Sequence, residues 1–352
     1  MALAERDARN PHLHGLTRPG QKFNMPALVG QPTTNNQQVP LRNRQGVRRA
    51  VEEMKSMPHP KSAIAWPPSC AAPRERIQAP SFVLPAGACD THAHVICADF
   101  ERYPLVPERS YTPPPAPEAL YLDMLRATGM QRGVLVQPSV YGTDNRYMLE
   151  VLQRHRDRLR GVAVVDERIS DDELAHMHAL GVRGVRINVL FRGGVNLDLM
   201  ERLAHRVADL GWHLQFLIDV RLLSELQARI ARLPCPVVID HFGHFPARLG
   251  VKEPGFELLL RNVAEHGWWV KLSGAYRLSE RHPDYADTDA LAHALLGVAP
   301  ERMVWGSDWP HVALESTPDT GSLLDRLRSW APDERQRQSI LVDNPAVLYD
   351  FK

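Results

Sequence analysis

The stretch Asp90-Thr-His-Ala-His94 ends the first of eight apolar runs in this chain of 352 residues. A strand is predicted over Ala88–His92, because short apolar runs bounded by turn signals are typical of buried strands. An open doubly wound α/β sheet usually follows its first strand with a Gly-x-Gly-x-x-Gly turn. This chain has no such turn and places two histidines there instead, which favours a closed barrel over an open sheet.

Seven further apolar runs follow at a regular pitch, separated by amphipathic, helix-like stretches. Near-continuous apolar strands that alternate with helices indicate a parallel sheet covered on both faces. Eight such units between residues 81 and 352 predict an α/β fold of the distorted (β/α)8 TIM-barrel type. The strands are expected at Ala88–His92, Gly133–Pro138, Gly161–Val165, Val182–Val189, His213–Ile218, Val237–Ile239, Trp268–Leu272 and Met303–Gly306. The helices are expected near Ala116–Gly129, Asn145–Leu159, Asp171–Leu180, Asp198–Leu210, Arg221–Arg232, Gly255–His266, Asp287–Leu296, Gly321–Trp330 and Pro332–Leu341.

The first 80 residues differ in composition from the rest of the chain. They carry 12 Lys and Arg against 5 Asp and Glu, whereas residues 81–352 carry 30 against 36. The formal charge of +1 therefore combines a basic head of +7 with an acidic body of −6. The head is rich in proline and polar residues and has few periodic apolar residues. The prediction is a flexible, irregular extension over 1–80 and a barrel over 81–352.

The composition argues against several functional classes. A net charge near zero gives no electrostatic basis for binding nucleic acid or an anionic membrane surface. No run approaches the roughly 18 apolar residues of a transmembrane helix, and the N-terminus lacks the apolar segment of a secretory signal. Four cysteines without Cys-x-x-Cys spacing are typical of free thiols in a reducing compartment, so a cytoplasmic location is expected. They are Cys70, Cys89, Cys97 and Cys235.

Histidines and a carboxylate stand at the predicted ends of strands 1 and 8. The chemistry of (β/α)8 barrels lies at the carboxyl ends of the strands. His92 and His94 are two residues apart, so both side chains point to the same side of the strand. Strands 1 and 8 are neighbours in a closed barrel, so Asp308 is expected to meet both histidines. Such a group suits a divalent metal, and the carboxylate suits a base that takes a proton from water.

Arg186 lies inside the predicted strand Val182–Val189. A guanidinium that faces a barrel interior is costly unless it is paired. Its partner is either a structural carboxylate or an anionic substrate held by two parallel hydrogen bonds. Arg192 and Arg277 follow strands 4 and 7, and the sequence alone leaves a surface position and a substrate contact equally open for each of them.

Three segments together resemble the amidohydrolase superfamily, in the branch that contains 2-pyrone-4,6-dicarboxylate lactonase and sugar-acid lactonases. They are Asp90-Thr-His-Ala-His94, Val238-Ile-Asp-His-Phe-Gly243 and Val304-Trp-Gly-Ser-Asp-Trp-Pro-His311. Further similar segments occur in the same order over roughly residues 80–352, and the ordered set is more specific than any single motif. The resemblance implies hydrolytic opening of a lactone ring on a distorted barrel. The further segments are Gln137-Pro-Ser139, Gly142–Asn145, Arg160–Asp166, Arg183–Asn188 and Leu341–Pro345.

The same resemblance implies roles for individual residues. Asp308 would activate the attacking water. His92, His94 and His241 would surround the lactone carbonyl oxygen. The residues that would bind the substrate are Arg186, Arg192, Arg277, Ser139, Tyr111, His244 and His311.

Two positions depart from the pattern of the pyrone enzyme. Leu217 stands where that enzyme has a tyrosine on strand 5, and His244 stands where it has an arginine. One hydroxyl contact and one fixed charge are therefore missing, so a planar dicarboxylate would be held less firmly. A lactone with one carboxylate, or a sugar-acid lactone, fits at least as well as the pyrone dicarboxylate.

The resemblance leaves the metal open. Many superfamily members bridge two metals with a carboxylated lysine on strand 4, whereas this strand offers Arg186, which argues against a binuclear site. One alternative is a single Zn²⁺ held by His92, His94, His241 and Asp308, and the other is a metal-free site in which the histidines polarise the carbonyl. The competing functions are a metal-dependent decarboxylase on the same barrel and a barrel that binds a small anion without turning it over.

Overall fold

Eight parallel strands form the centre of the protein in a computed structural model that describes residues 67–188, 190 and 199–352. Within the sheet each strand is hydrogen-bonded to the next along the chain, in the order β1 to β8. The predicted fold is confirmed, and each predicted strand overlaps an observed one. The strands are β1 (Cys89–Ala93), β2 (Arg132–Val136), β3 (Leu159–Ala163), β4 (Val182–Asn188), β5 (His213–Leu217), β6 (Val237–Ile239), β7 (Trp269–Ser273) and β8 (Met303–Gly306).

Strands β1 and β8 meet, so that the sheet curls into a nearly closed barrel. The hydroxyl of Thr91 donates to the carbonyl oxygen of Trp305 over 2.8 Å. Just beyond the end of β8, the backbone N–H of Asp308 donates to the carbonyl oxygen of His92, also over 2.8 Å. This contact brings the carboxyl ends of the two strands together, as the sequence predicted.

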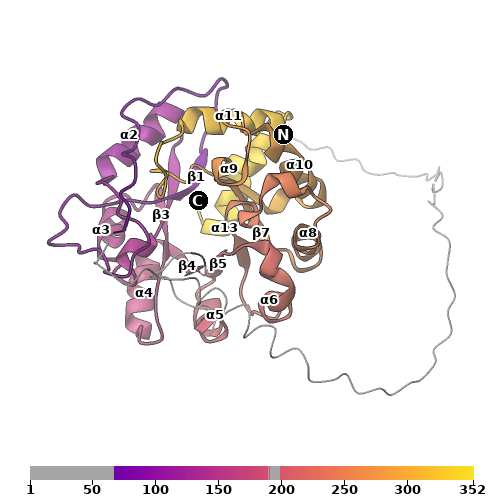
Figure 1. The fold of residues 1–352 in the computed structure, drawn as a ribbon. Coiled ribbons are helices and arrows are strands. Elements are labelled where there is room, and N and C mark those ends of the chain that lie inside the picture. The colour runs from indigo at the N-terminus through magenta and orange to yellow at the C-terminus, as the bar shows by residue number, and fades with distance from the viewer. Residues whose placement is uncertain (1–66, 189, 191–198) are drawn as a thin grey trace, which may run out of the picture. The chain divides into compact units, whose positions relative to one another are not determined.

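The longer helices lie in a ring around the strands (Figure 1). Their buried residues recur three or four positions apart and pack on the outer face of the barrel. Helix α4 begins with a capping box, in which the Ser170 hydroxyl accepts from the N–H of Glu173 and the Glu173 carboxylate accepts from the N–H of Ser170. These helices are α2 (Glu118–Thr128), α3 (Arg146–Arg154), α4 (Asp171–Ala179), α5 (Met200–Ala208), α6 (Leu223–Ile230), α8 (Pro254–His266), α10 (Asp289–Val298) and α11 (Thr320–Trp330).

The structure corrects the prediction at some helices. The helix expected to reach Leu159 ends at Arg154, because Leu159 is already paired with β2 as the first residue of β3. Two four-residue segments were not predicted, since four residues are too few to show a helical period: α7 (His241–His244), a turn with left-handed backbone angles, and α9 (Ala275–Leu278), a short helix. Both follow strands directly, at the carboxyl end of the barrel. Near the C-terminus, α12 (Glu334–Gln338) overlaps the last predicted helix, and α13 (Asn344–Tyr349) was not predicted.

Residues 67–80, which the prediction assigned to the extension, contact the barrel. The N–H of Cys70 donates to the carbonyl oxygen of Thr112 over 3.0 Å, and the N–H of Ala71 donates to that of Leu314 over 2.9 Å. This stretch belongs to the same compact unit as the barrel. The rest of the predicted extension, residues 1–66, lies outside the described residues.

All four cysteines are free thiols, as predicted. The longest helix in the described part of the chain is α8, with 13 residues. None of the helices described there combines the length and the apolar character that crossing a bilayer requires.

Candidate active site

Asp308 follows β8 in a backbone conformation that few side chains adopt. Its φ is 60°, in the left-handed region, where non-glycine residues are strained and often functional. The preceding Ser307 is held by Asp90, whose carboxylate accepts from both the N–H and the hydroxyl of Ser307 over 2.7 Å. A Cβ at Gly306 would lie only 2.7 Å from the Cβ of His92. The glycine and the Asp90 contacts thus let β8 run close to β1 and place Asp308 beside the histidines.

Three imidazoles surround one oxygen of Asp308. The Nε2 atoms of His92, His94 and His241 lie 3.9, 3.7 and 3.8 Å from Asp308 Oδ1. The ring centroid of His92 lies 5.1 Å from that of His94 and 4.6 Å from that of His241. The structure therefore brings together, from three strand ends, the four residues that the sequence singled out.

His241 reaches this group through a turn of left-handed residues. The φ angles of His241, Phe242, Gly243 and His244 are 50°, 52°, 72° and 51°. Non-glycine residues seldom adopt such angles, and they occur mainly where the surrounding structure imposes them. At Gly243 a Cβ would lie 2.2 Å from the side chain of Val220, so the turn needs glycine there. As a result both His241 and His244 line the mouth of the barrel.

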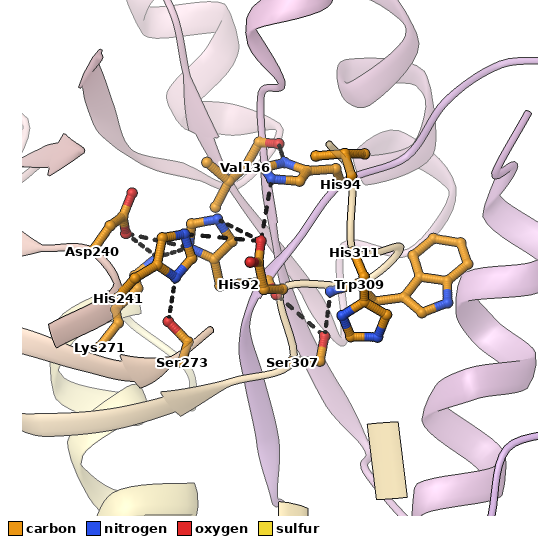
Figure 2. Close-up of polar contacts among 12 residues, drawn as sticks. His92, His94, Val136, Asp240, His241, Lys271, Ser273, Ser307, Trp309 and His311 are labelled. Carbon is orange, nitrogen blue, oxygen red and sulfur yellow. Dashed lines mark hydrogen bonds and ion pairs between the residues drawn. The ribbon is translucent and has the colours of Figure 1, made fainter. Parts of the chain in front are cut away.

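Two of the imidazoles have a hydrogen-bond partner at Nδ1, the ring nitrogen that does not face Asp308 (Figure 2). His94 Nδ1 lies 2.7 Å from the carbonyl oxygen of Val136, and His241 Nδ1 lies 2.8 Å from Ser273 Oγ. A carbonyl oxygen only accepts, so the proton of neutral His94 is on Nδ1. His94 therefore presents an unprotonated Nε2 to the interior of the site.

Burial keeps these histidines neutral at pH 7. It lowers the pKa of His92 and of His94 to about 3, although the carboxylates of Asp240 and Asp308 act in the opposite direction. It also lowers the pKa of His241 well below its usual value. A neutral imidazole offers one N–H donor and one acceptor nitrogen, so each ring can bind either a substrate oxygen or a metal, depending on its tautomer.

Asp308 is ionised, and among the described residues hydrogen-bond donors engage only one of its oxygens. Oδ2 accepts from the hydroxyl of Tyr276 over 2.7 Å and from Nε of Arg277 over 2.6 Å. Oδ1 is buried and has no hydrogen-bond partner among the described residues. Burial alone would raise the pKa of Asp308, but the Arg277 guanidinium holds it well below its usual range. Oδ1 is thus a charged acceptor that faces the three imidazoles.

A small cavity opens beside Asp308 at the mouth of the barrel. Its wall includes an apolar part formed by Leu217 and Val312. Burial raises the pKa of Tyr111 in this wall to about 12, so its phenol stays protonated. Five of the residues predicted to bind substrate line the cavity: Tyr111, Ser139, Arg186, His244 and Arg277.

The two arginines of the cavity differ in how their charge is used. Arg277 donates a hydrogen bond from Nε to Asp308 Oδ2. Arg186 is only 4% exposed, and its NH2 lies 3.4 Å from Asp240 Oδ2. Its NH1 lies 3.4 Å from the carbonyl oxygen of Gln137, while its Nε is buried without a hydrogen-bond partner in the described structure. Arg186 therefore has a structural carboxylate on one side and an unused donor on the other.

Two residues of the predicted substrate set are not among the cavity walls. Arg192 falls on residues that the structure does not describe. His311 is buried, with Nε2 lying 3.0 Å from Thr320 Oγ1 and Nδ1 lying 3.4 Å from the hydroxyl of Tyr276. Because that hydroxyl donates to Asp308, His311 stands behind the carboxylate and not beside the cavity.

The sequence reasoning did not identify Lys271, which is fully buried on β7. Its Nζ lies 2.8 Å from the carbonyl oxygen of Thr91, 2.7 Å from Gln215 Oε1 and 3.3 Å from His92 Nδ1. Burial lowers the pKa of Lys271 to about 8. The available signal was one charged residue inside the apolar run Trp269–Ser273, the same signal that marked the arginine of β4.

His92, His241 and Asp308 have the arrangement of a metal-binding group. Their ligand atoms all lie within 4.8 Å of one another, and all three side chains are buried. Neutral imidazole and carboxylate are ligands that Zn²⁺ accepts, and His92 Nε2 and Asp308 Oδ1 have no hydrogen-bond partner in the described structure. The donor set therefore fits one divalent ion. His94, which the prediction included as a ligand, is not part of this group.

A family model described as amidohydrolase matches residues 89–351. The 4-sulfomuconolactone hydrolase of Hydrogenophaga intermedia is 35% identical over 295 residues, which cover 82% of this chain and 97% of that protein. The 2-pyrone-4,6-dicarboxylate hydrolase of Comamonas testosteroni is 39% identical over 282 residues, which cover 77% of this chain and 92% of that protein. The family match therefore spans the whole barrel, including every strand end that contributes to the site.

Solved structures agree with these sequence matches. An apo structure from Agrobacterium tumefaciens superposes with a TM-score of 0.72 at 29% identity, over 78% of this chain and 99% of that chain. A Pseudomonas putida protein assigned as a 2-pyrone-4,6-dicarboxylic acid hydrolase superposes with a TM-score of 0.69 at 38% identity, over 76% of this chain and 99% of that chain.

Proposed function

This chain belongs to the amidohydrolase family, and from that premise we propose that it hydrolyses a small lactone that carries an anionic group. The two relatives described above are named for a sulfomuconolactone and a pyrone dicarboxylate. Both names denote cyclic esters with a sulfonate or carboxylate substituent. Opening such a ring requires an activated water and a group that stabilises the oxyanion.

One observation carries this proposal: three neutral imidazoles converge on the charged Oδ1 of Asp308, which has no hydrogen-bond partner in the described part of the chain. A carboxylate in this position is a base for a water molecule. His92 and His241 can each present an Nε2–H donor to a carbonyl oxygen in the same position, whereas His94 presents an acceptor nitrogen. A small cavity lies beside them.

In the proposed reaction Asp308 Oδ1 takes a proton from water while the water oxygen bonds to the lactone carbonyl carbon. The carbonyl π electrons move to the carbonyl oxygen, and imidazole N–H donors stabilise the resulting oxyanion. The carbonyl then re-forms as the bond from the carbonyl carbon to the ring oxygen breaks. The proton on Asp308 passes to the ring oxygen, so one water has been added and the carboxylate is restored.

The charge of the cavity wall supports a substrate with an anionic group. Among the described residues, the wall carries two guanidinium groups, those of Arg186 and Arg277, and one carboxylate, that of Asp308. His244 adds no charge at pH 7, since burial lowers its pKa to about 4. The unused Nε of Arg186 is suited to a carboxylate or a sulfonate oxygen. Because Leu217 and His244 supply no further cation, we propose a lactone with one fixed anionic group in preference to a dicarboxylate.

A divalent ion held by His92, His241 and Asp308 would lower the pKa of a bound water and polarise the lactone carbonyl. The residues that bind and orient the substrate would keep the same task, because Arg186 and Tyr111 lie outside that group.

The four free thiols also support a reducing, cytoplasmic location.

The test is a hydrolysis screen with the purified full chain, with and without a chelator. The panel contains a sulfonated muconolactone, a pyrone dicarboxylate, a monocarboxylated lactone and an aldonolactone, and ring opening is followed by acid release in a pH-stat. Turnover of an anionic lactone is the expected result. If the panel is inert while a carboxylic acid releases carbon dioxide, the chain is a decarboxylase and the proposed function is wrong.

A further inference from the structure

Lys271 takes no part in the steps proposed above for lactone hydrolysis. Its ammonium group is completely buried, and it faces three acceptors: the carbonyl oxygen of Thr91, Oε1 of Gln215 and Nδ1 of His92. An ammonium group has three N–H donors and accepts no hydrogen bond. These three acceptors match its three donors, and the Asp240 carboxylate lies further away, with Oδ1 3.7 Å from Nζ.

His92 Nδ1 also has a competing neighbour. Asp240 Oδ1 lies 3.2 Å from it, slightly closer than the 3.3 Å to Lys271 Nζ. A single ring nitrogen either donates or accepts, so the two neighbours demand different tautomers of His92. With Lys271 as the partner, the imidazole proton is on Nε2; with Asp240 as the partner, it is on Nδ1.

The surrounding hydrogen bonds favour Lys271 as the partner. Gln215 Nε2 donates to Asp240 Oδ2 over 3.0 Å, and its Oε1 accepts from Lys271, so the amide is fixed between the two charges. Arg186 contacts the same Oδ2. Asp240 Oδ1 has no hydrogen bond of acceptable geometry within the described structure, whereas the contact of Lys271 with His92 has one.

We propose that Lys271 is a positioning residue that holds His92 as the Nε2–H tautomer, and thereby makes it a donor to the carbonyl oxygen of the substrate. This role rests on the proposed lactone hydrolysis. The two histidines of the first strand end then differ, because His94 donates from Nδ1 to the Val136 carbonyl and presents an unprotonated Nε2. Of this pair, only His92 then has a protonated Nε2, and this nitrogen lies 3.9 Å from Asp308 Oδ1, the oxygen of the proposed base.

The same tautomer has a consequence for metal binding. A metal ligand needs an unprotonated nitrogen, and the histidine of a metal site typically donates its other N–H to a carboxylate or carbonyl. Asp240 is such an acceptor, and Lys271 competes with it for His92 Nδ1. Lys271 therefore opposes coordination by His92, and its removal frees Asp240 to support a metal.

The direct test is the ¹⁵N spectrum of histidine-labelled full chain, as purified and after dialysis against a chelator. Comparison with His92→Gln identifies the His92 signals. In the wild-type chain we expect a protonated Nε2 and an unprotonated Nδ1 for His92, and this measurement does not depend on whether a Lys271 variant folds. A protonated Nδ1 with an unprotonated or metal-bound Nε2 would overturn the assignment.

The variant Lys271→Met adds a functional readout. We expect kcat for the lactone to fall about 100-fold, as when one oxyanion donor is lost, with KM changed by less than about threefold. Zn²⁺ affinity, measured by titration calorimetry, should rise at least about tenfold. Unchanged kcat together with unchanged Zn²⁺ affinity in the folded variant would contradict the role of Lys271.

The two proposals fail in different ways. If the chain opens no lactone but His92 shows the Nε2–H tautomer, the proposed function is wrong and the effect of Lys271 on His92 stands. If the chain opens a lactone but His92 is protonated on Nδ1, the proposed function stands and the role of Lys271 is wrong.

Discussion

Nε of Arg277 lies 2.6 Å from Asp308 Oδ2, on the oxygen opposite the one that faces the three imidazoles. The hydroxyl of Tyr276 donates to the same oxygen. The carboxylate is thereby fixed with Oδ1 turned to the histidines. The same guanidinium offsets the effect of burial, so one residue both orients the proposed base and keeps it ionised.

Replacement of Arg277 by Met should move the acid limb of the kcat–pH profile to higher pH. The pKa of Asp308 is held low by Arg277, and it rises when that charge is removed. A base is active above its pKa and loses activity as the pH falls through it. Arg248→Met, at an exposed ion pair with Glu280, is the matched control and should leave the limb in place. Identical acid limbs in the two variants would show that Arg277 does not tune the base.

Replacement of Arg186 by Met should weaken binding of an anionic lactone. Charge-assisted hydrogen bonds contribute about 1.5–3 kcal/mol, so KM should rise roughly 10- to 100-fold. An uncharged lactone should show a much smaller change. Arg183→Met is the control, because Arg183 lies on the same strand and pairs with Asp350 away from the cavity. If KM rises equally for charged and uncharged lactones, Arg186 does not bind the anionic group.

Gly306→Ala should disturb the junction of β1 and β8. Its Cβ would lie 2.7 Å from the Cβ and 2.9 Å from the backbone nitrogen of His92, so one of the strands must move. Overpacking of this kind lowers the free energy of unfolding by about 1–3 kcal/mol, measured by urea denaturation.

Gly297→Ala, inside α10, provides the contrast to Gly306→Ala. A Cβ there meets nothing within 4 Å, so this variant should gain about 0.5–1 kcal/mol in the free energy of unfolding from the better helix propensity of alanine. Equal effects of the two substitutions would exclude a tight approach of β8 to β1.

Asp90→Asn should reveal an unusual pH dependence of stability. Burial raises the pKa of Asp90 from 3.8 to about 6, so the folded chain binds this proton more tightly than the unfolded chain does. The contribution of Asp90 to stability is then fully present below about pH 4 and is lost as the pH rises through 6. The wild-type advantage over Asp90→Asn should shrink by up to about 3 kcal/mol between pH 4 and pH 7. An advantage that grows over this interval would contradict the raised pKa.

The barrel and the central group of the site could be predicted from the sequence because both depend on local pattern and strand order. Apolar runs at a regular pitch fixed the eight strands. The two-residue spacing of His92 and His94, with strands 1 and 8 adjacent, was sufficient to bring them to Asp308.

The rest of the site depends on features that leave little trace in a single sequence. The turn at His241–His244 requires four consecutive positive φ angles, and the residue types at these positions do not predict them. The contacts of Lys271 could not be predicted, because a single lysine in an apolar strand does not indicate which acceptors surround it. His311 follows Asp308 closely in sequence, yet the turn after β8 directs it to Thr320 and away from the cavity.

The most direct test of the central claim is the kcat of Asp308→Asn on an anionic lactone that the wild-type chain hydrolyses. The substitution keeps the shape of the side chain and removes the base. We predict a loss of about 10²- to 10⁴-fold in kcat, with KM changed by less than about threefold and a wild-type circular dichroism spectrum. A folded Asp308→Asn chain whose kcat stays within about twofold of the wild-type value would contradict the assignment of Asp308 as the base.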